Sequence, residues 1–96
     1  MNAKVNVRLS GVFRGVSGKS QVTLEIEHPT VRKVIKQLSE SLSAEAKRLL
    51  LDAELNDPRP SALILVNGKE ISILKGLETE LKEEDEVVIV PVSHGG

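Results

Sequence analysis

A single long helix pattern, with strand patterns on both sides of it, most constrains how this chain can fold. After Pro29 and Thr30, apolar side chains recur at every third or fourth position: Val31, Val34, Ile35, Leu38 and Leu42. This spacing predicts an amphipathic helix with one apolar stripe, and Thr30 is suited to cap its N-terminus. Such a stripe needs a sheet or another helix to cover it.

Strand patterns on either side of this helix predict the sheet. They occur in four segments: residues 4–10, 21–27, 62–66 and 87–93. The first two alternate apolar and polar side chains, as half-buried strands do. The glycine-spaced stretch 11–18 predicts a hairpin turn between them, and Asn67-Gly68 predicts a tight hairpin after the third. A shorter helical segment is expected at 44–55. Together these elements indicate an α+β fold.

The composition of the chain excludes several classes of function. Its 96 residues suit one domain, with enough apolar side chains for one core but not for a deep active site as well. A net charge of −1 and a single aromatic residue, Phe13, argue against a nucleic-acid-binding surface. There is no cysteine, which excludes disulfides and zinc–thiolate sites. No apolar run has the length of a signal peptide or a membrane span, so we expect a cytoplasmic protein.

Two motifs that could carry chemistry are better interpreted as structure. Gly18-Lys19-Ser20 matches the end of a phosphate-binding loop, but Phe13 stands where that motif needs its first glycine. A strand pattern also follows, where phosphate binding needs a helix. His28 and His94 have no partners at the spacing of metal ligands, and the acidic run at 82–86 fits a solvated turn. We therefore expect no metal, no bound cofactor and no side-chain catalysis, which leaves a carrier or a binding module.

The chain ends on Gly95 and Gly96, a few residues after its last strand pattern. Glycine has no Cβ, so it can pass through a channel too narrow for other residues. Its carboxylate is also the least hindered acyl group that a chain can present. The alternative interpretation is that the two glycines are only a flexible C-terminal end with no function. We expect a domain at residues 1–92 and a flexible tail at 93–96.

In this order, the segments resemble the ubiquitin-like β-grasp sulfur carriers. These are the small subunit of molybdopterin synthase (MoaD), the thiazole-synthesis carrier ThiS, the ubiquitin-related modifier and the small archaeal modifier proteins. The resemblance covers nearly all of residues 4–96 and is carried by VNVRLSGVFRGVSGKSQVTLEIE, RPSALILVNGKEI, GLETELKEEDEVVIVPV and the final Gly-Gly. It implies a mixed sheet of about four to five strands packed on one main helix. Val90-Pro91 stands where synthase subunits tend to have two prolines, and the His94-Gly95-Gly96 ending is more similar to the ubiquitin-related modifier.

The resemblance also implies a function centred on Gly96, with Gly95 beside it. An activating enzyme of the ubiquitin-activating type would use ATP to adenylate the Gly96 carboxylate, which would then become a thiocarboxylate. The sulfur would go to a molybdopterin precursor or a tRNA through an acceptor enzyme, or a lysine of a target protein would form an isopeptide bond. The chain would be a carrier and modifier, not an enzyme, and a monomer when free. The alternative is a non-covalent ubiquitin-like adaptor that binds through its sheet.

The partner-binding face is expected on the sheet. Segments 62–66 and 87–92 are almost wholly apolar, although one helix covers only one face of a small sheet. The β-grasp pattern implies that Ile64, Val66, Val87 and Ile89 face the helix. The other apolar side chains would face outward as a binding patch: Leu63, Leu65, Val88, Val90 and Val92. Alternatively, they are filler under the second helical segment or the 11–18 loop. His94 is either read by the activating enzyme or solvated.

Overall fold

The computed structural model describes residues 2–41, 44, 47–48 and 62–91. Along these residues the elements are β1 (Asn2–Leu9), α1 (Val12–Ser17), β2 (Gln21–Glu27), α2 (Val31–Ser41), β3 (Ala62–Val66), β4 (Lys69–Glu70), η1 (Ile71–Ile73), η2 (Gly76–Glu78) and β5 (Glu86–Pro91), where η1 and η2 are 3-10 helices. The helical segment expected at 44–55 lies outside the described residues except for Ala44, Lys47 and Arg48, and so does Leu42 of the apolar stripe.

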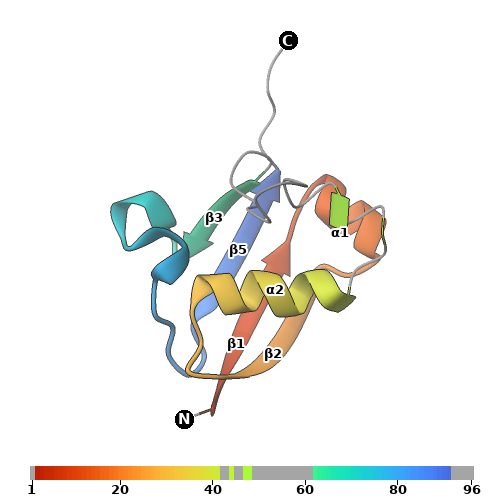
Figure 1. Cartoon of the computed structure of the whole chain (residues 1–96). Coiled ribbons are helices and arrows are strands. Elements are labelled where there is room, and N and C mark those ends of the chain that lie inside the picture. The colour runs from red at the N-terminus through yellow and green to blue at the C-terminus, as the bar shows by residue number, and fades with distance from the viewer. Residues whose placement is uncertain (1, 42–43, 45–46, 49–61, 92–96) are drawn as a thin grey trace.

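The five strands form one mixed sheet in the order β2-β1-β5-β3-β4. Figure 1 shows β2, β1, β5 and β3 side by side in this order. The last strand lies in its centre, parallel to β1 on one side and antiparallel to β3 on the other. The remaining neighbours, β1 with β2 and β3 with β4, pair antiparallel as hairpins do. The expected mixed sheet on one main helix is confirmed.

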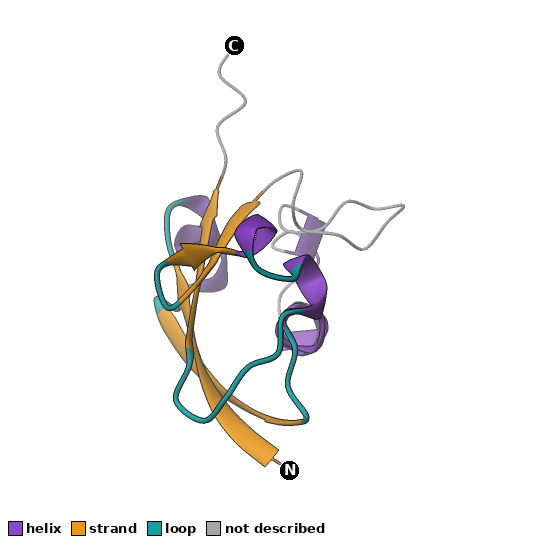
Figure 2. Ribbon diagram, turned by 90° about the vertical axis from the view of Figure 1, so that its left-hand side faces the viewer, coloured by secondary structure: helices purple, strands orange, loops and turns teal. Residues whose placement is uncertain are grey.

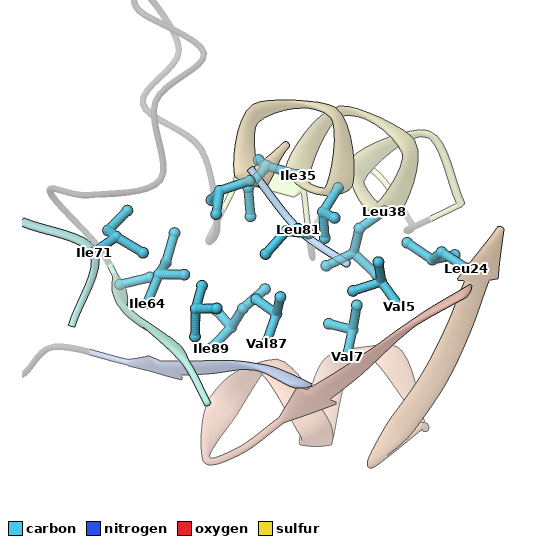
Figure 3. Packing of buried hydrophobic residues seen from close by; sticks show 14 of the residues in the cluster. Val5, Val7, Leu24, Ile35, Leu38, Ile64, Ile71, Leu81, Val87 and Ile89 are labelled. Atoms are coloured by element: carbon cyan, nitrogen blue, oxygen red, sulfur yellow. The ribbon is translucent and has the colours of Figure 1, made fainter. Parts of the chain in front are cut away.

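Helix α2 lies across one face of the sheet, and the core fills the space between them (Figures 2 and 3). The hydroxyl of Thr30 accepts a hydrogen bond from the Lys33 N–H at 3.2 Å, which confirms the predicted N-cap. The described residues of the apolar stripe are all buried: Val31, Val34, Ile35 and Leu38. The sheet contributes the opposite wall of the core through Val5, Val7, Leu24, Ile26, Ile64, Val66, Val87 and Ile89.

The connection between β1 and β2 differs from the expected turn. The two strands do pair antiparallel, but residues Val12–Ser17 between them form helix α1. The helix is closed at its end by Gly18, whose φ of 71° is left-handed and whose N–H donates to the Arg14 carbonyl at 3.0 Å. Phe13 is buried in the main core, with 4% of its surface exposed, and this contact stabilises a helix too short to be stable alone. A strand follows Ser20, as predicted, in the place where a phosphate-binding loop would need a helix.

The hairpin at Asn67-Gly68 is confirmed, but its return strand is shorter than expected. Both residues have positive φ, 49° and 85°, as a type I′ turn requires. Strand β4 comprises only two residues, and the chain then turns into η1. The Glu70 carboxylate accepts hydrogen bonds from the N–H and the hydroxyl of Ser72, which caps this turn, while Ile71 is buried beneath it.

Candidate functional site

The outer face of the sheet, away from α2, carries an apolar patch on β3 and β5. In the antiparallel register Leu63 lies opposite Val90 and Leu65 opposite Val88; we call these four residues the outer patch. Leu63 is 39% exposed and the other three are half-buried. The residues that alternate with them face α2 and are buried: Ile64, Val66, Val87 and Ile89. The predicted orientation of both sets is confirmed, while Val92 lies outside the described residues.

Helix α1 covers part of this face. It lies at the end of β1, on the side of the sheet away from α2, and contacts β5 (Figures 2 and 3). Val88 and Arg14 of α1 line the same hollow, so α1 lies beside the outer patch at Val88. The filler interpretation stays a prediction for Val88, because the second helical segment lies almost wholly outside the described residues. It does not account for Leu63, which remains exposed among the described residues.

The polarity of the outer face changes along the strands. At the start of β5, Arg8 Nε lies 3.4 Å from the Glu86 carboxylate, and the Thr23 hydroxyl donates to Asn6 at 3.1 Å. At the other end of the strand the outer side chains are apolar. Because β5 runs from Glu86 to Pro91, the outer patch occupies the end of the sheet from which the chain continues toward Gly96.

A hollow of about 420 Å³ borders the outer patch at Val88. Arg8 and Arg14 both line it, together with Leu9, Ser10, Ser20 and Gln21. Arg8 already pairs with Glu86 at 3.4 Å, so this edge of the patch carries two cationic side chains of which at least one has a carboxylate partner within the chain. Neither arginine was predicted from the sequence to be a site residue. The outward position of Arg8 follows from its alternation with Val7 and Leu9, but the proximity of Arg14 depends on α1.

The end of β5 is held from two sides. On the β1 side, the Ile89 carbonyl accepts hydrogen bonds from the Ser10 N–H at 3.2 Å and from the Ser10 hydroxyl at 3.4 Å. On the other side, Pro91 lies opposite Ala62 at the start of β3. The position of the last described residue before the glycines is therefore set by two neighbouring strands.

Comparison with known protein families identifies the family to which this chain belongs. The model of the ThiS family matches residues 7–96. The chain belongs to the ThiS family. A protein of Archaeoglobus fulgidus, named as a candidate sulfur carrier, is 35% identical over 79 residues, which cover 81% of this chain and 86% of that protein. Ubiquitin-related modifier 1 of Gallus gallus is 31% identical over 87 residues, which cover 88% and 83%.

The fold of solved structures agrees with the ThiS-family assignment. The solution structure of small archaeal modifier protein 1 from Methanosarcina acetivorans matches with a TM-score of 0.82 and 31% identity, and the match covers 100% of this chain and 99% of that one. The expected resemblance and the ubiquitin-like β-grasp fold are both confirmed. This ThiS-family chain thus belongs with sulfur carriers and protein modifiers, a class distinct from enzymes.

The remaining site predictions for this ThiS-family member concern the chain after Pro91. Val92, His94, Gly95 and Gly96 lie outside the described residues, so their predicted roles stay predictions. Among the described residues, no group of three or more His, Asp or Glu side chains is placed to hold a metal ion. Nor does that part of the chain contain a helix long and apolar enough to cross a membrane.

Proposed function

We propose that this ThiS-family chain carries sulfur on the carboxylate of Gly96 and is the substrate of an ATP-dependent enzyme of the ubiquitin-activating type. The observation that carries the proposal is the family match, which continues through the two terminal glycines to residue 96. The position of the outer patch supports it, because β5 belongs to the patch and also leads to the glycines. Five residues follow Pro91, and five extended residues reach roughly 17 Å, enough to enter a partner's active site.

The proposed chemistry takes place at one carbonyl. A Gly96 carboxylate oxygen attacks the α-phosphorus of ATP, which forms an acyl adenylate and releases pyrophosphate. A persulfide sulfur then attacks the acyl carbon and AMP leaves. A second thiol cleaves the sulfur–sulfur bond of that acyl persulfide, so a disulfide forms and the thiocarboxylate stays on Gly96. The chain has no cysteine, which is consistent with a carrier that holds its sulfur on the main-chain terminus.

The loaded carrier has two proposed outcomes. It donates its sulfur to a molybdopterin precursor or to a tRNA uridine held by an acceptor enzyme. Alternatively, a lysine amine of a target protein attacks the activated carbonyl, and an isopeptide bond replaces the bond to the leaving group. The relatives support both outcomes, since one is named for sulfur carriage and another as a modifier.

In this proposal the outer patch binds the activating enzyme while the glycines enter its active site. Leu63, Leu65, Val88 and Val90 supply apolar contact area, with Val92 as a fifth member of the patch. Arg8 and Arg14 at its edge favour a partner with acidic groups around an apolar centre. His94 would lie between the patch and the reacting carbonyl.

Deletion of Gly96 tests the function directly. ATP–pyrophosphate exchange with the cognate activating enzyme should require the intact terminus, and an added residue after Gly96 should abolish exchange as the deletion does. The amide spectrum of both variants should show an unchanged fold. Protein isolated from native cells should contain a form heavier by about 16 Da, the difference between oxygen and sulfur on the acyl group. Unchanged exchange after the deletion would contradict the proposal and favour the non-covalent adaptor.

A further inference from the structure

Gly11 and Pro91 make a close approach at the end of the sheet from which the C-terminal residues continue. Gly11 follows β1 with a φ of 59° and a ψ of −135°. A Cβ built on Gly11 would lie 2.6 Å from Pro91 Cγ and 3.1 Å from Pro91 Cδ. Ring puckering can move Cγ, but Cδ is bonded to the backbone nitrogen of Pro91 and cannot rotate away from the contact. Any side chain at position 11 would therefore displace backbone.

Neither backbone segment is free to shift. Ser10, just before Gly11, donates two hydrogen bonds to the Ile89 carbonyl. The Gly11 carbonyl accepts from the Gly15 N–H at 3.1 Å, which begins α1. On its other side, Pro91 lies opposite Ala62 of β3. Relief of a clash at Gly11 would thus have to move the end of β5 or disturb the start of α1.

The contact occurs where hydrogen bonding between β1 and β5 ends. In this parallel ladder the Asn6 N–H donates to the Asp85 carbonyl and the Ser10 N–H donates to the Ile89 carbonyl. The same alternation assigns the next bond to the nitrogen of residue 91, which in proline carries no hydrogen. Packing of the Pro91 ring against Gly11 takes the place of this bond.

We propose that Gly11 is a positioning residue for the reaction at Gly96, an inference that rests on the proposed function. Val90 belongs to the outer patch and Pro91 is the next residue, so the Gly11 contact fixes where the final residues begin relative to the docked face. When those residues are extended in a partner's active site, a shift at Pro91 is passed on to the carboxylate. A misplacement of about 1 Å can lower a rate by about a hundredfold.

Gly11→Ala tests the proposal, and Gly18→Ala is its matched control. Both glycines have positive φ, 59° and 71°, so alanine is strained at either position. The strain is larger at Gly11, whose ψ of −135° is outside the αL region that Gly18 adopts, so the rescue experiment below is needed to separate the Pro91 contact from backbone strain. Only position 11 meets Pro91, whereas a Cβ at Gly18 has no atom within 4 Å. We expect Gly11→Ala to lower kcat for ATP–pyrophosphate exchange by about tenfold or more with KM for the carrier unchanged, and Gly18→Ala to leave both within about twofold. Equal kcat values for the two variants would overturn the proposal.

Removal of the ring provides a rescue experiment. In the double variant Gly11→Ala/Pro91→Ala the Cγ and Cδ atoms are absent, and the Pro91 Cβ lies 3.9 Å from the built Cβ, an ordinary contact distance. The double variant should therefore recover the kcat of Pro91→Ala alone. If Gly11→Ala does not fold, recovery of folding by the double variant supports the same contact. A double variant as impaired as Gly11→Ala in either measurement would overturn it.

An amide spectrum of the free protein separates this inference from the proposed function. Gly11→Ala should shift the Val92 amide signal, the first after Pro91, while Gly18→Ala should leave it in place. If the wild-type chain supports no exchange at all, the proposed function fails, and the Val92 comparison still decides whether Gly11 positions the chain beyond Pro91. Equal shifts in both variants would overturn the positioning role.

Discussion

The two faces of β3 and β5 are built from the same kinds of side chain but have different surroundings. On the inner face Ile64 is 1% exposed and Ile89 is fully buried, whereas on the outer face Leu63 is 39% exposed. Hydrophobicity alone therefore does not separate core from binding surface in this sheet. The pleat assigns each residue to a face, and α2 covers only one of them. The outer face carries apolar side chains that are only half-buried or exposed, which is the basis for the predicted binding surface.

Neighbouring aspartate substitutions on the two faces should give the largest contrast. Ile64→Asp would bury a carboxylate without a partner, at a cost of several kcal/mol, and a small domain is stable by only about 5–15 kcal/mol. We expect it to lose the dispersed amide spectrum and the cooperative thermal transition of the wild type. Leu65→Asp should retain both, because its side chain faces outward and is half-buried. Loss of folding in both variants would contradict the assignment of faces.

Substitutions on the outer face should affect binding to the activating enzyme although they leave the domain folded. Leu65→Asp and Val90→Asp should weaken this binding by about 2 kcal/mol or more, roughly thirtyfold in Kd, as loss of a central interface contact does. Ile73 provides the control, because it is apolar and 73% exposed but lies outside the outer patch. Ile73→Asp should change Kd little in the same titration calorimetry experiment. An equal loss for Ile73→Asp would place the binding surface elsewhere.

The smallest effect is expected at the charged end of the outer face. The side chains of Arg8 and Glu86 are 60% and 44% exposed, so solvent screens their attraction. Arg8→Ala should change the free energy of unfolding by about 0.5 kcal/mol or less, and high salt should reduce the difference further. Urea unfolding at low and high salt measures both effects. A loss well above about 1 kcal/mol would mean that this end of the face contributes to the fold as the inner face does.

The parts of the fold that were predicted correctly have local causes. Alternation identified the longer strands, the Thr30 hydroxyl marked the start of α2, and Asn67-Gly68 marked the tight hairpin. Helix α1 was missed because six residues do not form a stable helix by local preference, and the burial of Phe13 that stabilises it is a tertiary contact. The early end of β4 has a similar cause, since Ile71 turns into the core rather than continuing a strand.

In the candidate site, too, some features follow from local sequence patterns and others depend on tertiary contacts. The outward positions of Leu63, Leu65, Val88 and Val90 follow from the two-residue period of a strand. Arg14 and the contact of Gly11 with Pro91 do not, because each brings together residues from opposite ends of the chain. Nothing near Gly11 in the sequence indicates that a proline ring will pack against it. Only the parallel pairing of β1 with β5 creates that neighbour.

The central position of β5 also affects how the domain is made. Ser10 and Ile89, which join β1 to β5, are 79 positions apart, so the middle of the sheet is completed only after the other four strands have been synthesised. A nascent chain that stops before Glu86 can form its two hairpins, but these have no strand to join them. Such non-local pairing is slow to form, and it cannot begin until β5 has been synthesised. A chain interrupted before Glu86 therefore lacks the strand that makes the two hairpins into one sheet.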